Sequence, residues 1–434
     1  MSAHAHHTGL TLRHSAVLIH RYAGLFMAAF LIVIGLTGSI IVFNSELTHW
    51  LDPPPQVGAQ NAAVLDGLVL RDRAQALYPT ASFNYVNLHV AKDQAFLTPA
   101  EPRIDPATKQ PFDLGFEALY LDPYTGRELG RVQSGGNWPI TRHNIVPLIN
   151  RLHYALALPD SWGLWLFGIV AVIWTLDCVV SVYLTFPTRL QRSAATGSES
   201  AGRSWLGRWW RPSWLVKWRG SPFRINFDLH RAGGLWLWLL LAVFAWSGVG
   251  FNLSDQFYTP VMHALFGMPD VYGNGVPALP NPHTDPATPW EEIRETARRE
   301  VQSRSLALNF RVLGEEGLYY QPDKGLFTYL VRSDRDVTSE GGGSVLLLDD
   351  RGRPLGFSLP TGQNVGATLN TWLFALHTAE VWGMPFRLFV ALMGILVSGF
   401  SITGVYIWWK KRRARTHRQR ISVKNSIHFQ GSHS

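Results

Sequence analysis

Two apolar segments of the chain open with the same motif, a histidine followed by an arginine and then by small residues. The motif reads HRYAGL at residues 20–25 and HRAGGL at residues 230–235. Roughly twenty residues with almost no charge follow each motif, which is enough helix to cross a bilayer. A histidine in such a segment costs free energy unless it has a partner or a function. The recurrence therefore predicts a duplicated membrane protein whose histidines hold something between helices.

Four segments have the length and composition of membrane-spanning helices. They cover residues 15–43, 163–186, 232–252 and 385–409. The remaining sequence is polar enough to form water-exposed parts, so the fold class we expect is a mainly α membrane protein. Its four spans would form a two-fold repeat of helix, outer loop and helix, with a small α+β module in each long outer loop.

The Lys and Arg residues between the spans indicate the orientation, because basic loops stay on the cytoplasmic side. Loop 187–229 has eight Lys and Arg against two acids, and tail 410–434 has eight against none. Loop 44–150 has eight basic residues against eleven acids, and loop 253–376 has ten against fifteen. Both termini are therefore predicted to be cytoplasmic. The net charge of +8 reflects topology, and nucleic acid is not needed to explain it.

The outer loops repeat the same local patterns. Residues 66–78 and 290–304 have the pattern of short amphipathic helices. Alternating apolar strands then meet Asp- and Gly-containing turns at residues 119–126 and 345–352, which is a good hairpin signal.

The chain as a whole is predicted to have nine parts. They are a tail 1–14, span 15–43, module 44–150, span with lead-in 151–186, basic Trp-rich loop 187–229, span 230–252, module 253–376, span with lead-in 377–409 and tail 410–434.

Topology sorts four histidines into two layers. His20 and His230 lie at the inner ends of the first and third spans, and His153 and His377 lie just outside the second and fourth. Two histidines that face each other from two helices can bind both axial positions of one haem iron. An apolar site favours the neutral imidazole that this ligation needs. We therefore expect two haem sites, one in each layer.

Other residues near these layers could complete the sites. Gly24, Gly233 and Gly234 would let a flat macrocycle approach the backbone, and Arg21 and Arg231 could meet its propionates.

Four further candidates have open roles. His49 and His263 could complete the outer site or line substrate access, His143 could share a helix face with His153, and Asp177 could carry protons or pair with Arg21 or a polar neighbour. Each histidine could also be a plain interface residue.

Several classes of chemistry are absent from the sequence. The single cysteine, Cys178, excludes Cys-x-x-Cys-His haem attachment and thiolate iron–sulfur clusters. No Gly-rich nucleotide motif and no zinc-protease motif is present. Electrons would therefore have to come from another molecule.

The chain resembles the PepSY-associated transmembrane family of bacterial inner-membrane proteins. The resemblance rests on the motifs at residues 20–24, 152–156, 230–236 and 403–409, and on the turn LDPYTG at 121–126, which resembles the PepSY module itself. Within the family, the chain is similar to di-haem ferric-siderophore reductases. This implies four spans, b-type haem and reduction of a ferric siderophore in the periplasm. The mechanism we expect is electron transfer across the membrane from an external donor, a quinol or a cytoplasmic reductase.

Two other functions remain open at this stage. The histidines could be structural, with the outer modules binding a peptide or a partner domain as a regulator does. The chain could also be a siderophore or metal permease, although it has no obvious polar pathway through the spans.

Overall fold

The computed structural model describes residues 3–431 apart from 134–137, 160, 188–209, 271 and 339–340, with side chains described between residues 12 and 417. The Trp-rich stretch around Trp205 and Trp209 lies outside the described residues. The chain divides into two compact units. Unit 1 comprises Met1–Val42, Ile149–Ser254 and Arg387–Ser434, and unit 2 comprises Phe43–Leu148 and Asp255–Phe386.

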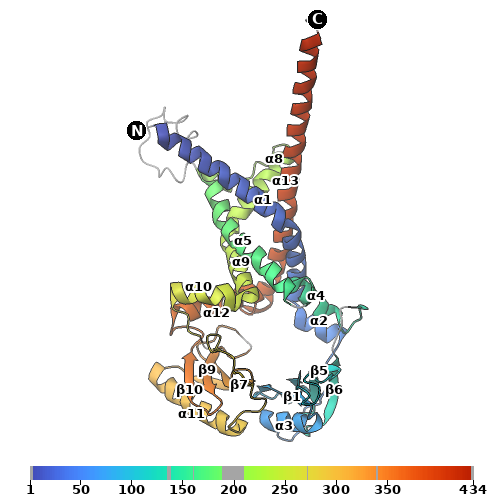
Figure 1. Ribbon diagram of the computed structural model, residues 1–434, viewed down its shortest axis with the longest axis vertical. Coiled ribbons are helices and arrows are strands. Elements are labelled where there is room, and N and C mark those ends of the chain that lie inside the picture. The colour runs from blue at the N-terminus through green and yellow to red at the C-terminus, as the bar shows by residue number, and fades with distance from the viewer. Residues whose placement is uncertain are drawn as a thin grey trace. The chain divides into compact units, whose positions relative to one another are not determined.

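Unit 1 consists of long apolar helices (Figure 1). They are α1 (Ala3–Ile41), α5 (Trp162–Thr185), α8 (Pro222–Trp236), α9 (Trp238–Asn252) and α13 (Gly383–Gly431), with the short η1 (Arg211–Trp214) before α8. Among the described residues, three helices are long and apolar enough to cross a membrane: Leu12–Ile41, Trp162–Thr185 and Gly383–His417. The first, second and fourth predicted spans are confirmed as such helices.

The third predicted span differs from the structure. Residues 232–252 were expected to form one helix, but α8 and α9 meet at Leu237 with a bend of 69°. Two adjacent glycines, Gly233 and Gly234, precede the break, and glycine pairs lower helix propensity at such kinks. The described part of the chain therefore has three helices that could span a membrane, or four if the bent pair crosses as one span. The four-span two-fold repeat remains a prediction.

Helices α1 and α13 cross at a pair of glycines. A Cβ atom at Gly394 would overlap the carbonyl oxygen of Gly35, and one at Gly35 would overlap that of Gly394. Two serines lie at the crossing: Ser39 Oγ donates to the Ala391 carbonyl at 2.7 Å, and Ser398 Oγ lies 3.1 Å from the Gly394 carbonyl and 3.2 Å from that of Ile32. Small residues that let two backbones meet in this way are typical of helix pairs in membranes.

Replacing Gly394 by alanine is expected to destabilise unit 1 by about 1–3 kcal/mol, because the new methyl group has to push two backbones apart. The free energy of unfolding in detergent measures this effect. Gly399→Ala on the same helix is the matched control, since a Cβ there meets nothing within 4 Å. Equal stability of the two variants would contradict the close crossing.

Unit 2 is built from helices and antiparallel sheets. The helices are α2 (Asn44–Leu51), α3 (Gly67–Leu77), α10 (Thr259–Phe266), α11 (Trp290–Leu308) and α12 (Val365–Thr378), with a π-helical turn η2 (Ser254–Tyr258), while α4 (Ile145–Ala155) runs from this unit into unit 1. A three-stranded sheet has the order β3 (Phe96–Pro99), β5 (Phe116–Leu121) and β6 (Glu128–Gln133), and β1 (Ala81–Ser82) pairs with β4 (Glu101–Pro102). The predicted helices at 66–78 and 290–304 and the first predicted hairpin are confirmed.

A five-stranded sheet joins the two outer loops. Its order is β10 (Pro354–Ser358), β9 (Ser344–Asp349), β8 (Leu326–Ser333), β7 (Val312–Gln321) and β2 (Tyr85–Asn87). Strands β9 and β10 form the second predicted hairpin. Strand β2 comes from the first loop and pairs with β7 of the second, with Tyr85 opposite Tyr319 and Asn87 opposite Gly317. The prediction of one separate module in each loop therefore differs from the structure, where both loops share a sheet.

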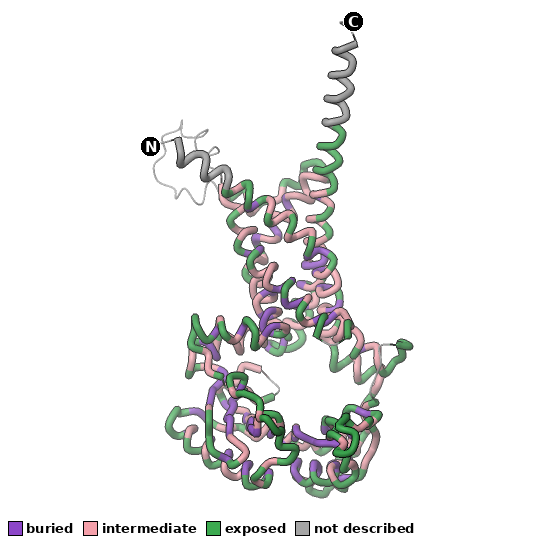
Figure 2. Tube along the Cα trace, viewed as in Figure 1, coloured by how far each residue is buried: buried purple, intermediate pink, exposed green. Residues whose placement is uncertain are grey.

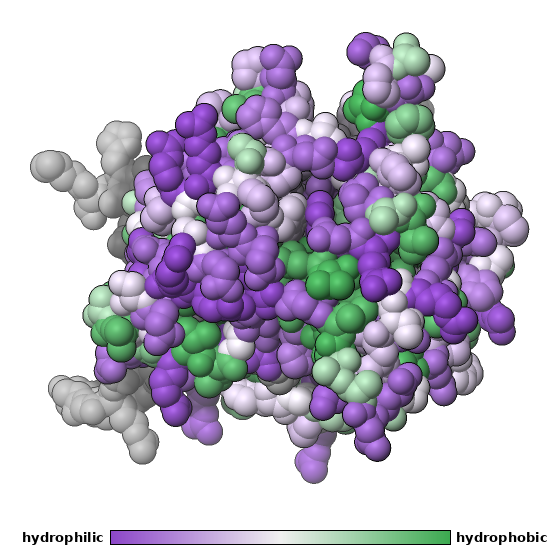
Figure 3. Space-filling model, turned by 90° about the horizontal axis from the view of Figure 1, so that it is seen from below, coloured by the Kyte–Doolittle hydropathy of each residue, from purple (hydrophilic) through white to green (hydrophobic). Residues whose placement is uncertain are grey.

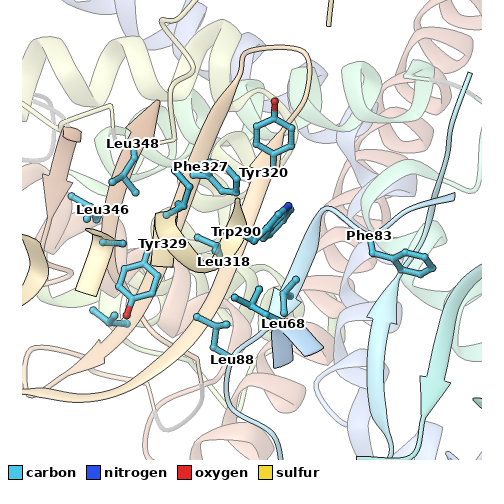
Figure 4. Close-up of a cluster of buried hydrophobic side chains, with 14 of the residues drawn as sticks. Leu68, Phe83, Leu88, Trp290, Leu318, Tyr320, Phe327, Tyr329, Leu346 and Leu348 are labelled. Atoms are coloured by element: carbon cyan, nitrogen blue, oxygen red, sulfur yellow. The ribbon is translucent and has the colours of Figure 1, made fainter. Parts of the chain in front are cut away.

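The two loops also share a hydrophobic core. Helix α11 buries Trp290, Ile293, Ala297 and Val301, which recur at helical spacing and so form one face of the helix. Figure 2 colours the chain by burial and shows the buried residues of this unit on its strands and helices. In Figure 4, Leu68 and Leu88 of the first loop lie in the same cluster as Trp290. The face of the molecule drawn in Figure 3 is mostly hydrophilic with smaller apolar patches, as expected of a part exposed to water.

Candidate functional site

The helices of unit 1 line a partly open cavity of about 440 Å³. Its walls come from α1, α5, α8, α9 and α13 and are largely apolar, including Met27, Leu31, Trp174, Leu241 and Val397. The polar side chains that line it are mainly histidines, arginines and Asp177. The cavity is therefore an apolar compartment with a small number of placed polar groups, which is the usual form of a cofactor or ligand site.

His20 and His230 meet in this cavity. His20 lies within α1 and His230 within α8, and their ring centroids are 6.3 Å apart with a tilt of 54°. Two imidazoles that bind opposite sides of one metal ion have centroids roughly 6 Å apart, since each metal–nitrogen bond is about 2 Å and each ring adds roughly 1 Å. The structure thus brings together the two residues of the predicted inner site at a spacing suited to joint ligation.

The hydrogen bonds of the two rings define which nitrogen would meet a metal. His20 Nδ1 lies 3.0 Å from both carboxylate oxygens of Asp177, so its N–H donates to that side chain. His230 Nδ1 lies 2.9 Å from Thr403 Oγ1, whose own hydroxyl donates to the Phe400 carbonyl at 2.9 Å. Because that hydroxyl proton is already used, His230 Nδ1 donates as well. Both rings therefore carry their proton on Nδ1, which leaves the Nε2 lone pair for ligation.

Glycines provide space beside both histidines. Gly24 and Gly234 line the cavity four residues after His20 and His230, and a Cβ at either would meet nothing within 4 Å. One turn of helix separates each glycine from its histidine, so both lie on the same face as the ring. Both positions therefore leave open space beside the rings. Gly233 has another role, because its Cβ would come 2.8 Å from the Phe400 ring.

The two predicted anion-binding arginines differ in their surroundings. Arg231 lines the cavity but donates to Asp228 at 2.9 Å and to the Pro212 carbonyl at 2.8 Å. Asp228 is fully buried and also accepts from Arg224 at 2.9 Å. Arg21 lines the same cavity, and no carboxylate in the described part of the chain pairs with it. Arg21 therefore suits an anionic ligand group better than Arg231 does.

Residues 17–411 match the protein family described as the PepSY-associated TM region. This match covers His20, His230 and nearly the whole cavity wall. The chain belongs to the PepSY-associated transmembrane family. It is accordingly a membrane protein. No curated protein matches it.

The family match also includes His153, which lies in unit 1 near the other end of the helices. Its Nδ1 is 3.1 Å from the Ile34 carbonyl and 3.1 Å from Thr37 Oγ1. Since a carbonyl can only accept, this ring too carries its proton on Nδ1. A Cβ at Gly38 would come 2.9 Å from His153 Cε1, so Gly38 makes room for the ring against α1.

The other outer histidines of this family member lie in unit 2. His377 is in the last turn of α12, and the exposed His263 and His49 are on α10 and α2. Helices α10 and α12 contact each other, and Tyr258 Oη donates to Asn370 Oδ1 at 3.0 Å beside that contact. The pairing of His153 with His377 stays a prediction.

His143 does not share a helix with His153, because α4 begins at Ile145. It lies 2.6 Å from Asp52 in an exposed pair. Among the residues that the structure describes, no group of three or more His, Cys, Asp or Glu could hold a metal ion. The two-histidine arrangement in the cavity is therefore the candidate site. A Cβ at Gly404 would come 3.2 Å from His230 Cε1, so Gly404 makes room for that ring as Gly38 does for His153. These two glycines, Thr403 and Thr37 are supporting residues that the sequence did not predict.

Proposed function

We propose that this PepSY-associated protein is a b-type haem protein of the bacterial inner membrane that passes electrons across the membrane to a ferric siderophore in the periplasm. The observation that carries the proposal is the His20–His230 pair, with both Nδ1 atoms donating to protein acceptors and open space at Gly24 and Gly234. A pair of histidines from two helices is the usual arrangement for a haem with two axial protein ligands.

The residues of the cavity fit such a group. His20 and His230 would hold its iron through Nε2, Gly24 and Gly234 would leave room for its ring, and Arg21 would meet a propionate. When bound, a haem with two histidine ligands supplies one-electron transfer. Asp177 and Thr403 fix the orientation of the two imidazoles, and most of the wall around them is apolar.

A second group would be held near the other end of the helices. His153 is pre-oriented by Ile34 and Thr37, with His377 as its proposed partner and His49 and His263 as further candidates near the outer surface. The charge of the loops supports a direction, because the basic loop 187–229 and tail 410–434 favour the cytoplasmic side. Both termini would then be cytoplasmic and unit 2 periplasmic.

The proposed reaction is a one-electron reduction of ferric iron to ferrous iron. An external donor, a quinol or a cytoplasmic reductase, would be oxidised, and the iron in a siderophore docked on the periplasmic side would be reduced. Siderophore oxygens are hard ligands that prefer the smaller and more highly charged ferric ion. Reduction therefore weakens the complex and releases iron.

The proposal is tested by a reduced-minus-oxidised absorption spectrum of the purified protein, with haem quantified per chain. We expect about two b-type haems, and reoxidation of the reduced protein by ferric siderophores. Protein made with ample haem supply that is nonetheless colourless would overturn the proposal and favour a PepSY-type binding or regulatory role.

Gly234→Leu provides a variant that fills the site without removing a ligand. The new side chain projects into open space and improves helix propensity, so the helix should form as before. We expect this variant to lose the haem of the inner site. Full haem content in the variant would show that the cavity is not where haem binds.

A further inference from the structure

The two histidines of the cavity have unequal partners. Both oxygens of the Asp177 carboxylate lie 3.0 Å from His20 Nδ1, whereas His230 Nδ1 meets a neutral hydroxyl, that of Thr403, at 2.9 Å. Asp177 is the single acid within α5. Its side chain is only 10% exposed. An acid this well buried in a spanning helix needs a specific partner or role.

The surroundings of the carboxylate show that His20 is its main partner. Asp177 lies on the cavity wall, and the described ion pairs connect it to His20. Two of the arginines that line the cavity have other acceptors: Arg13 donates to the carbonyls of Leu184 at 2.8 Å and Phe186 at 3.0 Å, and Arg231 donates to Asp228. The hydrogen bond that the buried carboxylate accepts therefore comes from one imidazole, that of His20.

A carboxylate that accepts the Nδ1 hydrogen bond has two effects on a ligating imidazole. It increases electron density on Nε2 and fixes the ring orientation. It also places a negative charge close to the metal in a low-dielectric site, which favours the more highly charged oxidation state. A threonine hydroxyl provides orientation with little charge. The two axial ligands of one metal would thus differ in donor strength.

We propose that Asp177 is a positioning residue that holds His20 and strengthens it as a ligand, so that the inner site has a low reduction potential. This inference rests on the proposed function, since it assumes that His20 and His230 share one haem. Asp177 acts through His20 and contacts no substrate. A low potential at the inner site would make electron transfer to an acceptor on the other side favourable.

The experiment is a redox titration of the purified holoprotein with wild-type Asp177 and with Asp177→Asn. Asparagine keeps the size and a hydrogen-bond acceptor but removes the charge. We expect the midpoint potential of one haem to rise. Each tenfold loss in the preference of the site for ferric over ferrous iron corresponds to a rise of about 59 mV. We also expect a changed low-spin ferric signal in electron paramagnetic resonance. The second haem should keep its potential.

Three comparisons make the result specific. Asp177→Glu restores the charge and should bring the potential back toward wild type, and Thr403→Ser keeps the hydroxyl and should leave it unchanged. Asp177→Ala should weaken haem binding by about 10–100-fold, as loss of such supporting residues does. If Asp177→Asn fails to accumulate, the haem affinity of Asp177→Ala remains a test, because alanine removes both the charge and the hydrogen-bond acceptor.

The outcomes separate the two proposals. Wild-type protein without haem overturns the proposed function together with this inference. Haem-loaded Asp177→Asn with wild-type potential and resonance signal overturns the inference alone, and Asp177 is then a purely structural partner of His20. Wild-type haem affinity in Asp177→Ala would overturn it in the same way.

Discussion

His230→Ala is expected to remove the inner haem and to abolish electron transfer across the membrane. The ring lies in the cavity between α8 and α13 with its Nδ1 bound to Thr403, and alanine leaves nothing to replace Nε2 as a ligand. The loss should exceed the 10–100-fold that changes to supporting residues cause, because a ligand itself is removed. Haem content per chain and the rate of ferric-siderophore reduction measure the effect, and His20→Ala should behave alike.

His143→Ala is the matched control for these variants. His143 is exposed and pairs with Asp52 outside α4, so its loss should leave haem content and spectrum unchanged. If His230→Ala and His20→Ala both retained full haem with unaltered spectra, the inner site would be wrong. Circular dichroism of each variant shows whether the helices have formed.

Hydropathy predicted the long helices because a run of apolar residues long enough to cross a membrane can be recognised from composition alone. The spans at 15–43, 163–186 and 385–409 correspond to helices that the structure contains. The break at Leu237 was not predictable in this way, since an apolar window has the same mean hydropathy whether the helix is straight or bent. Gly233 was interpreted as space for a cofactor, whereas it packs against Phe400.

Local patterns also predicted the hairpins, but not how the sheets are shared. The turns at residues 122–126 and 349–352 contain Asp and Gly residues that favour tight turns. Strand β2 is only three residues long, and its partner β7 lies more than two hundred residues later in the chain. No local periodicity specifies such a pairing, so the shared sheet became visible only in the structure.

The candidate site could be predicted in part. The repeated HR motif identified His20 and His230, because a histidine recurring in register is conspicuous against apolar sequence. Their partners were less accessible: Asp177 had several possible neighbours, and the structure selects His20 rather than Arg21. Thr403 lies on another helix and has no signature of its own among the small residues of α13.

Arg294→Met is expected to destabilise unit 2 strongly, because Arg294 joins the two outer loops. Its guanidinium, whose side chain is 8% exposed, donates to Glu315 at 2.8 and 3.1 Å and to Asp66 of the first loop at 2.7 Å. Removing one partner of a buried ion pair leaves the other unpaired and costs about 3–5 kcal/mol. Glu315 keeps Arg298 and Tyr329, so we expect the lower end of that range.

Thermal unfolding of the purified protein measures this loss. Arg311→Ala in the same unit is the control, since its side chain is 81% exposed and its pair with Asp334 should contribute about 0–1 kcal/mol. Equal destabilisation by the two substitutions would contradict the prediction, because the contacts of Arg294 with Glu315 and Asp66 would then contribute no more than an exposed ion pair.

The same bridge predicts how stability depends on pH. Burial raises the pKa of Glu315, but hydrogen bonds from Arg294, Arg298 and Tyr329 outweigh it and lower that pKa from 4.5 to about 2. A carboxylate with a depressed pKa stabilises the fold fully above its unfolded value, and this contribution is lost as the pH falls through the folded one. Glu315 should therefore stabilise unit 2 above pH 4.5 and lose that contribution toward pH 2. In Glu315→Gln, the acid-induced loss of stability over this interval should be smaller than in wild type, and an identical pH profile would contradict the bridge.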